Sequence, residues 1–262
     1  MTTRLTGVAL LADAEGTNPG PVDIVIDNGL IAAIEPSSAA ARPRLLAMPA
    51  LANAHDHARP LSPTSFGGAG KPLETWLLRL GAMPPIDPYL GALAAFGRAA
   101  RAGAASVMAH YVRPHGPAPL LDEARQVARA AADVGVRVTF ALFMRDRNPL
   151  VYGPPDSLLD GIPPEARRVV EAQFLGAMPS AGEQVARVEA IAQAVESPTF
   201  PVEFGPNGVQ WCSDQLLRAI AEASARTGAG SICICSRRCI SAPSRTPPTP
   251  RASFNISMKS AC

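Results

Sequence analysis

Strand, loop and helix patterns alternate throughout residues 51–228, and this alternation limits the fold more than any other feature of the chain. Short apolar runs are followed by Gly- or Pro-containing loops and then by Ala-rich helical segments. Such repeats are typical of βα units whose strands form a parallel sheet. We therefore expect an α/β fold with four parallel strands, near residues 49–57, 105–110, 136–143 and 201–206.

A separate pattern precedes these units. Residues 4–12 and 22–34 read as strands, and Asp27-Asn28-Gly29 predicts a tight hairpin because Asn-Gly suits a type I′ turn. This small sheet carries no arrangement suited to catalysis, so we expect it to pack on the larger domain. Helices are expected at 73–80, 88–103, 120–134, 164–178, 180–196 and 215–227. Ser213 or Asp214 should cap the last helix, and Gly228 should end it. The long loop 58–88 reads either as a lid or as an ordinary surface insertion.

Two histidines end the first expected strand. His55 and His57 are two residues apart, so their side chains point to the same side of a strand, roughly 6.6 Å apart along the chain. Two such imidazoles can converge on one metal ion, which each approaches to about 2.0–2.1 Å. The plain alternative is a chance pair of loop histidines. The chain has only four histidines.

The runs Asp27–Ile34, Met48–Leu51 and Asn53–His57 resemble the start of the amidohydrolase superfamily, in particular its cytosine deaminase and chlorohydrolase-like branch. The resemblance implies an incomplete (β/α)₈ TIM-type barrel preceded by part of a composite β-sandwich. On this basis we expect an N-terminal β-sandwich part at 1–50, the first half of a hydrolase barrel at 51–228, and an irregular, unrelated tail at 229–262.

The resemblance also implies a function, a metal-dependent hydrolysis of non-peptide carbon–nitrogen bonds such as the deamination of a heterocyclic amine. His55 and His57 match two of the family's metal ligands. One divalent ion, Zn²⁺ or Fe²⁺, is expected, because the chain places no lysine near the fourth strand that could bridge two metals. The strand end bearing His110 faces the active site of a barrel, so His110, and more weakly His115, are candidate substrate contacts, as hydrogen bonding within a loop is the alternative. The loop after strand four makes Gln210 and Trp211 further candidates.

The tail changes the expectation for activity. Residues 229–262 contain no Asp, Glu or His but carry five basic residues and four of the five cysteines. If the codons of residues 231–241 are read from the third base of each, permitted choices spell HLHLLETLYQ, and residues 252–261 give IVQHLDEIG. These resemble the family's fifth strand and the helix after it. We therefore expect a frameshift, real or from sequencing, near residues 228–230. The catalytic proton shuttle would then lie beyond residue 228, leaving a truncated and inactive chain.

Composition excludes other classes. A hydrophobic content of 47% predicts a globular core, and a net charge of +2 gives no reason to expect nucleic acid or a membrane. With no signal-like start and no long apolar run, a cytoplasmic enzyme with a small-molecule substrate is expected, and a homo-oligomer is compatible with it. Two alternatives stay open, namely a non-catalytic remnant that binds a partner, and a protein that binds metal or nucleic acid through its Cys-rich tail.

Overall fold

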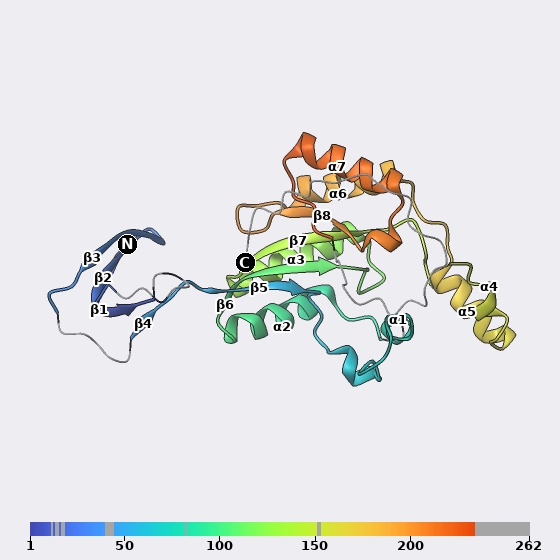
Figure 1. Cartoon of the computed structure of the whole chain (residues 1–262), viewed down its shortest axis with the longest axis horizontal. Helices are drawn as coiled ribbons and strands as arrows, with labels where there is room; N and C mark the ends of the chain where they lie inside the picture. Colours follow the sequence, from blue (N-terminus) through green and yellow to red (C-terminus); the bar gives the residue numbers. More distant parts are fainter. Residues whose placement is uncertain are drawn as a thin grey trace.

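The computed structural model describes residues 1–11, 13, 16, 19–39, 45–81, 83–150 and 153–233. These residues form two four-stranded sheets, of which only the second is covered by helices (Figure 1). None of the helices in the described ranges is both long enough and apolar enough to cross a membrane.

The first sheet comes from the N-terminal residues and has the strand order β3-β2-β1-β4. Its hairpin turns at Asn28 and Gly29, whose φ angles of 49° and 78° are both in the left-handed region that a type I′ turn requires. The predicted hairpin is therefore present, and a short fourth strand that the sequence did not reveal pairs parallel with β1. The strands are β1 (Thr2–Leu10), β2 (Val22–Asp27), β3 (Leu30–Pro36) and β4 (Leu46–Ala47).

The second sheet has the order β5-β6-β7-β8, and every neighbouring pair is parallel. All four predicted strands are present, as β5 (Leu51–Asp56), β6 (Ala104–Tyr111), β7 (Arg137–Met144) and β8 (Val202–Pro206). The connections carry the 3-10 turns η1 (Pro63–Phe66) and η2 (Val209–Trp211) and the helices α1 (Leu73–Gly81), α2 (Pro88–Arg101), α3 (Leu120–Val134), α4 (Asp156–Leu159), α5 (Pro164–Phe174), α6 (Ala181–Val195) and α7 (Asp214–Thr227).

Local capping explains several helix boundaries. The Ser213 hydroxyl accepts from the backbone N–H of Leu216 at the start of α7, and Gly228 ends this helix in the left-handed conformation, as expected. At α6, Ser180 and Glu183 form a reciprocal capping box. Helix α4, inside the Pro/Gly loop 149–164, was not predicted, because four residues are too few to show a helical period.

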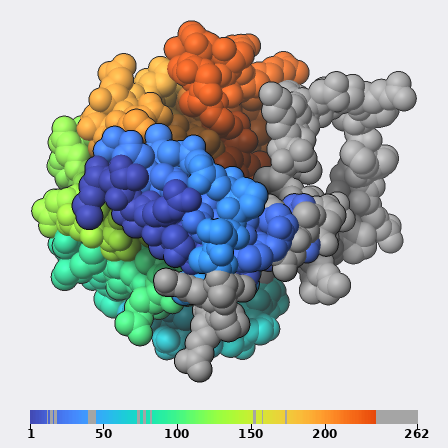
Figure 2. Space-filling model, turned by 90° about the vertical axis from the view of Figure 1, so that its left-hand side faces the viewer, coloured from blue at the N-terminus to red at the C-terminus, as the bar shows by residue number. Residues whose placement is uncertain are grey.

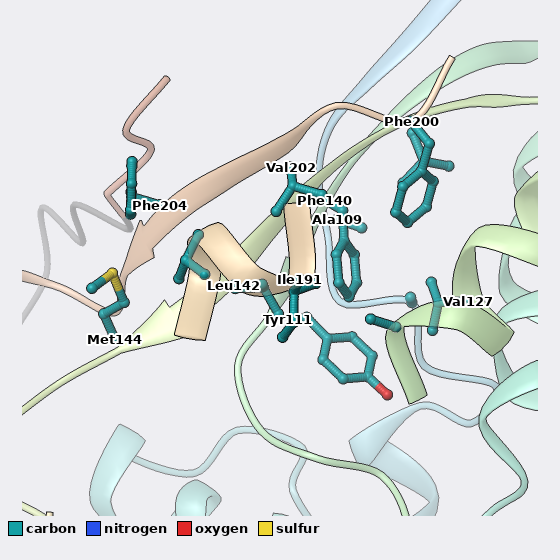
Figure 3. Close-up of a cluster of buried hydrophobic side chains, with 14 of the residues drawn as sticks. Ala109, Tyr111, Val127, Phe140, Leu142, Met144, Ile191, Phe200, Val202 and Phe204 are labelled. Atoms are coloured by element: carbon teal, nitrogen blue, oxygen red, sulfur yellow. The ribbon is translucent and has the colours of Figure 1, made fainter. Parts of the chain in front are cut away.

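The hydrophobic core lies on one face of the parallel sheet. Phe140, Tyr111 and Val202 point from the strands toward Val127 of α3 and Ile191 of α6 (Figure 3). Helices α2, α3, α6 and α7 all contribute to this one cluster. A doubly wound sheet would carry helices on both faces, whereas a barrel carries them only outside. The architecture is therefore half of a (β/α)₈ barrel, as predicted.

The small N-terminal sheet lies at one end of the parallel strands, and helices α1, α4 and α5 lie at the other (Figure 1). In Figure 1 the small sheet lies beyond the amino ends of β5–β8, while α1, α4 and α5 lie beyond their carboxyl ends. The view in Figure 2 places the small N-terminal sheet in front of the helical body. The carboxyl ends, where barrel enzymes carry their active sites, thus face away from the small sheet.

Beyond α7 the chain returns to the edge of the sheet. The carbonyl of Phe204 accepts from the N–H of Ile232 at 2.9 Å, and the N–H of Phe204 donates to the carbonyl of Gly230 at 3.1 Å. Ser231 thereby forms a parallel bridge beside β8, in the place of a fifth barrel strand. Of the expected tail 229–262, residues 234–262, which include Cys235, Cys239 and Cys262, lie outside the described residues.

Candidate metal centre

The end of β5 positions His55 and His57. The carboxylate of Asp56 accepts from the backbone N–H groups of His57 and Ala58 at 2.7 and 2.8 Å, and Asn53 donates to the same carboxylate at 3.0 Å. Ala58 has a φ of 50°, so the chain turns sharply here. An acidic residue between the histidines therefore anchors the turn that ends the strand.

The two rings lie close together in an edge-to-face arrangement. Their centroids are 4.8 Å apart with an interplanar angle of 87°. Two imidazoles bound to one tetrahedral Zn²⁺ would have centroids about 5 Å apart, given zinc–nitrogen distances of about 2.0–2.1 Å. The spacing thus suits a shared metal ion.

A backbone hydrogen bond orients His57. Its Nδ1 lies 2.9 Å from the carbonyl oxygen of His110. Because a carbonyl can only accept, Nδ1 carries the proton and Nε2 keeps its lone pair. Metal-binding histidines are commonly held in this way by a partner on the second nitrogen. Burial, followed by the charge of Arg59, lowers the pKa of His57 to about 4, so the ring is neutral at neutral pH.

His110 joins the pair from β6. Its ring centroid is 4.9 Å from that of His55 and 6.4 Å from that of His57, and the residue is buried. Burial is also the main cause that lowers its pKa to about 4. Within the described ranges, however, no three His, Cys, Asp or Glu side chains converge as a complete metal site. This half-barrel therefore provides two imidazoles at a spacing that suits one ion, with a third ring beside them.

The other predicted contacts lie elsewhere on the same edge. Gln210 and Trp211 form η2 after β8, at the opposite side of the sheet from β5. Their carbonyl oxygens accept from the loop after β7, Gln210 from the Asn148 side chain and Trp211 from the N–H of Asp146. The structure therefore brings the three histidines together, while Gln210 and Trp211 lie across the width of the sheet.

A buried group of cationic side chains was missed by the sequence interpretation. Arg59 follows β5, Arg113 follows β6, and both line a small cavity with His115. Burial lowers the pKa of His115 to about 4, with Arg59 and Arg113 contributing. The sequence did offer one signal, the position of each arginine. Arg59 follows the histidine pair by two residues, and Arg113 follows the end of β6 by two residues, so both lie at the same edge of the sheet.

Glu123 of α3 holds this loop in place. Its carboxylate is fully buried and accepts from the Tyr111 hydroxyl at 2.8 Å and from the N–H groups of His115 and Gly116 at 2.9 and 2.6 Å. The helical pattern of residues 120–134 gave no sign that one carboxylate points inward. Its role is to fix the chain that follows β6.

A one-sided parallel sheet with paired histidines at its carboxyl edge places these side chains where barrel enzymes carry their active sites. Consistent with this, residues 46–231 match the Amidohydrolase family, and the chain belongs to that family. No curated protein sequence matches the chain significantly.

Solved structures share the fold at low sequence identity. Atrazine chlorohydrolase from Arthrobacter aurescens TC1, complexed with zinc, is 16% identical with a TM-score of 0.60, covering 88% of this chain and 52% of that one. Guanine deaminase from C. acetobutylicum, with bound guanine, is 15% identical with a TM-score of 0.59, covering 89% and 52%. An adenosine deaminase from Xanthomonas campestris, with bound zinc, is 17% identical with a TM-score of 0.59, covering 88% and 48%. The chain thus spans about half the length of these proteins.

Proposed function

We propose that this chain carries the first half of a metal-dependent hydrolase that acts on non-peptide carbon–nitrogen bonds, such as the amino group of a heterocyclic amine. The observation that supports it most is the His57 ring, whose Nδ1 is bonded to the His110 carbonyl while its other nitrogen is left free beside His55. Family membership and the deaminase and chlorohydrolase names of the structural neighbours support the same reaction class.

One divalent ion, Zn²⁺ or Fe²⁺, would be held by His55 and His57 together with ligands from later strands. When bound, such an ion supplies a water acidic enough to act as a nucleophile near neutral pH. The side chains described here do the holding and positioning. Asp56 anchors the turn, and the His110 carbonyl sets the tautomer of His57. His110, Gln210 and Trp211 are proposed substrate contacts.

We expect the 262-residue chain by itself to be inactive, because two imidazoles are fewer than the three protein ligands of a catalytic zinc site. The frameshift near residues 228–230 is part of this proposal, and it fits the end of the family match at residue 231. Sequencing the genomic DNA over codons 220–245 tests it. Histidine and glutamate codons in the third-base frame would support the shift, and their absence would refute it.

Metal binding by the purified chain tests the site. Zinc content after equilibrium dialysis should fall roughly tenfold or more in His55→Ala and stay unchanged in Cys233→Ala. The reverse result would favour the alternative of a Cys-rich metal-binding tail. Equal zinc content in both variants and the parent chain would favour the non-catalytic remnant. Appreciable metal-dependent deaminase activity of the parent chain would contradict the expectation that it is inactive.

A further inference from the structure

A small cavity lies beside the histidine pair, between the two ends of loop 58–88 and the loop after β6. Its volume is about 20 Å³, and because one water needs roughly 10–15 Å³ by this measure it has room for one or two polar atoms. The wall is cationic on one side and apolar on the other. Its lining residues are Arg59, Pro60, Met83, Pro84, Ile86, Arg113 and His115.

Arg59 supplies an unused donor to this cavity. The residue is only 9% exposed, and its buried Nη2 has no hydrogen-bond partner. The residue is nevertheless held in place, since its carbonyl accepts from Arg98 at 2.8 Å and its guanidinium lies 5.5 Å from the centre of the Trp76 ring. A buried donor that is fixed but unpaired is costly unless a ligand completes it.

Arg113 brings a second cationic side chain to the same cavity. Within the described ranges no ion pair reaches Arg59 or Arg113. Burial, followed by the charge of Arg113, lowers the pKa of Arg59 to about 10, and the carboxylate of Asp56 opposes this shift more weakly. The Nε2 of His115 is also buried without a partner. Two buried nitrogen atoms, Arg59 Nη2 and His115 Nε2, are therefore without a partner here, and Arg113 lines the same cavity.

We propose that this cluster is an anion subsite that binds a carboxylate of the substrate. The proposal rests on the function proposed above and narrows it to carbon–nitrogen substrates that carry a carboxylate. A guanidinium matches a carboxylate through two parallel hydrogen bonds. Arg59 is two residues from His57, and its charge acts on that ring, so an anionic group held here would lie next to the histidine pair.

Residues 83–86, which precede α2, form the apolar wall of the subsite. Ile86 donates its N–H to the carbonyl of His115 at 3.2 Å, which ties this wall to the loop after β6. Met83, Pro84 and Ile86 exclude water from one side, and hydrogen bonds to an anion are stronger where water is excluded.

Thermal unfolding of the whole chain in the presence of a chelator tests this subsite without any metal. Propionate should raise the unfolding midpoint by about 3 °C relative to its neutral isostere propionamide at equal ionic strength. The difference should vanish in Arg59→Met and in Arg113→Met. It should persist in Arg101→Met, which removes an exposed arginine from the far end of α2.

A second measurement separates lost binding from lost folding. Without anion, Arg113→Met should unfold at the same midpoint as the parent chain or a higher one, because an unpaired buried charge has been removed. Propionate stabilisation that survives in both arginine variants, or is absent from the parent chain, would overturn the subsite. Inorganic phosphate acting more strongly than propionate through the same arginines would overturn the carboxylate assignment in favour of a free phosphate.

The proposed function and the subsite can fail independently. His55→Ala should abolish zinc binding while leaving the propionate response unchanged. A propionate response without zinc binding in the parent chain would refute the hydrolase proposal alone. Zinc binding without a propionate response would refute the subsite alone.

Discussion

At the scale of single residues, Glu123 should contribute strongly to stability. It accepts three hydrogen bonds in a fully buried position. In Glu123→Gln one acceptor oxygen becomes an NH₂ group that faces existing donors. We expect the free energy of unfolding to fall by about 2–3 kcal/mol in urea titrations. Asp122→Asn is the control, because the half-exposed pair of Asp122 with Arg125 contributes about 0.5 kcal/mol or less. Equal effects of the two changes would contradict this role.

His115 predicts a dependence of stability on pH. Its pKa is about 4 in the folded chain and about 6.5 when unfolded. Between these two pH values the unfolded chain binds a proton at His115 that the folded chain does not bind. The contribution of His115 to the free energy of unfolding is therefore fully present above about pH 6.5 and is lost as the pH falls toward 4. The loss from this one group is roughly 3 kcal/mol. Urea titrations with chelator should show a shallower pH dependence in His115→Gln, and parallel curves for the two proteins would refute the assignment.

At the scale of elements, Gly205 explains how closely β8 pairs with β7. A Cβ at this position would lie 2.6 Å from the carbonyl oxygen of Leu142. Gly205→Ala should therefore lower the free energy of unfolding by about 2 kcal/mol or more. The clashing carbonyl belongs to β7, an inner strand whose backbone is held on both sides and cannot shift without loss of stability. Gly97→Ala in α2 meets nothing within 4 Å and should instead raise it by up to about 1 kcal/mol. Urea titrations of both variants check the pair, and a stable Gly205→Ala would contradict the tight register.

At the scale of the whole molecule, the described sheet does not close on itself. Strand β5 is an edge, and Leu51 on it is 53% exposed. Open apolar edges pair with other chains, so we expect association that grows with concentration in sedimentation velocity. Leu51→Lys should weaken it, whereas Leu90→Lys, which replaces a leucine 59% exposed on α2, should not. Association unchanged by Leu51→Lys would place the contact elsewhere.

The sequence predicted some elements of the structure and missed others. The strands and most helices were predictable because β-branched runs and Ala-rich periods are local signals, and the Asn28-Gly29 hairpin follows from its turn chemistry. Short β4 and α4 were missed because two to four residues carry no period. Which ring nitrogen of His57 is free could not be predicted, since the carbonyl that decides it belongs to His110, 53 positions away.

The amino-acid sequence alone determined the order of the βα units, the presence of a histidine pair at a strand end and the change of character near residue 229. Each of these depends on neighbours in the chain. Only the tertiary structure decided that all the core helices cover one face of the sheet, that Glu123 points inward, and that Arg59 and Arg113 share a cavity. Those features arise where parallel strands bring loops from distant positions to one edge, and a local pattern carries no record of that meeting.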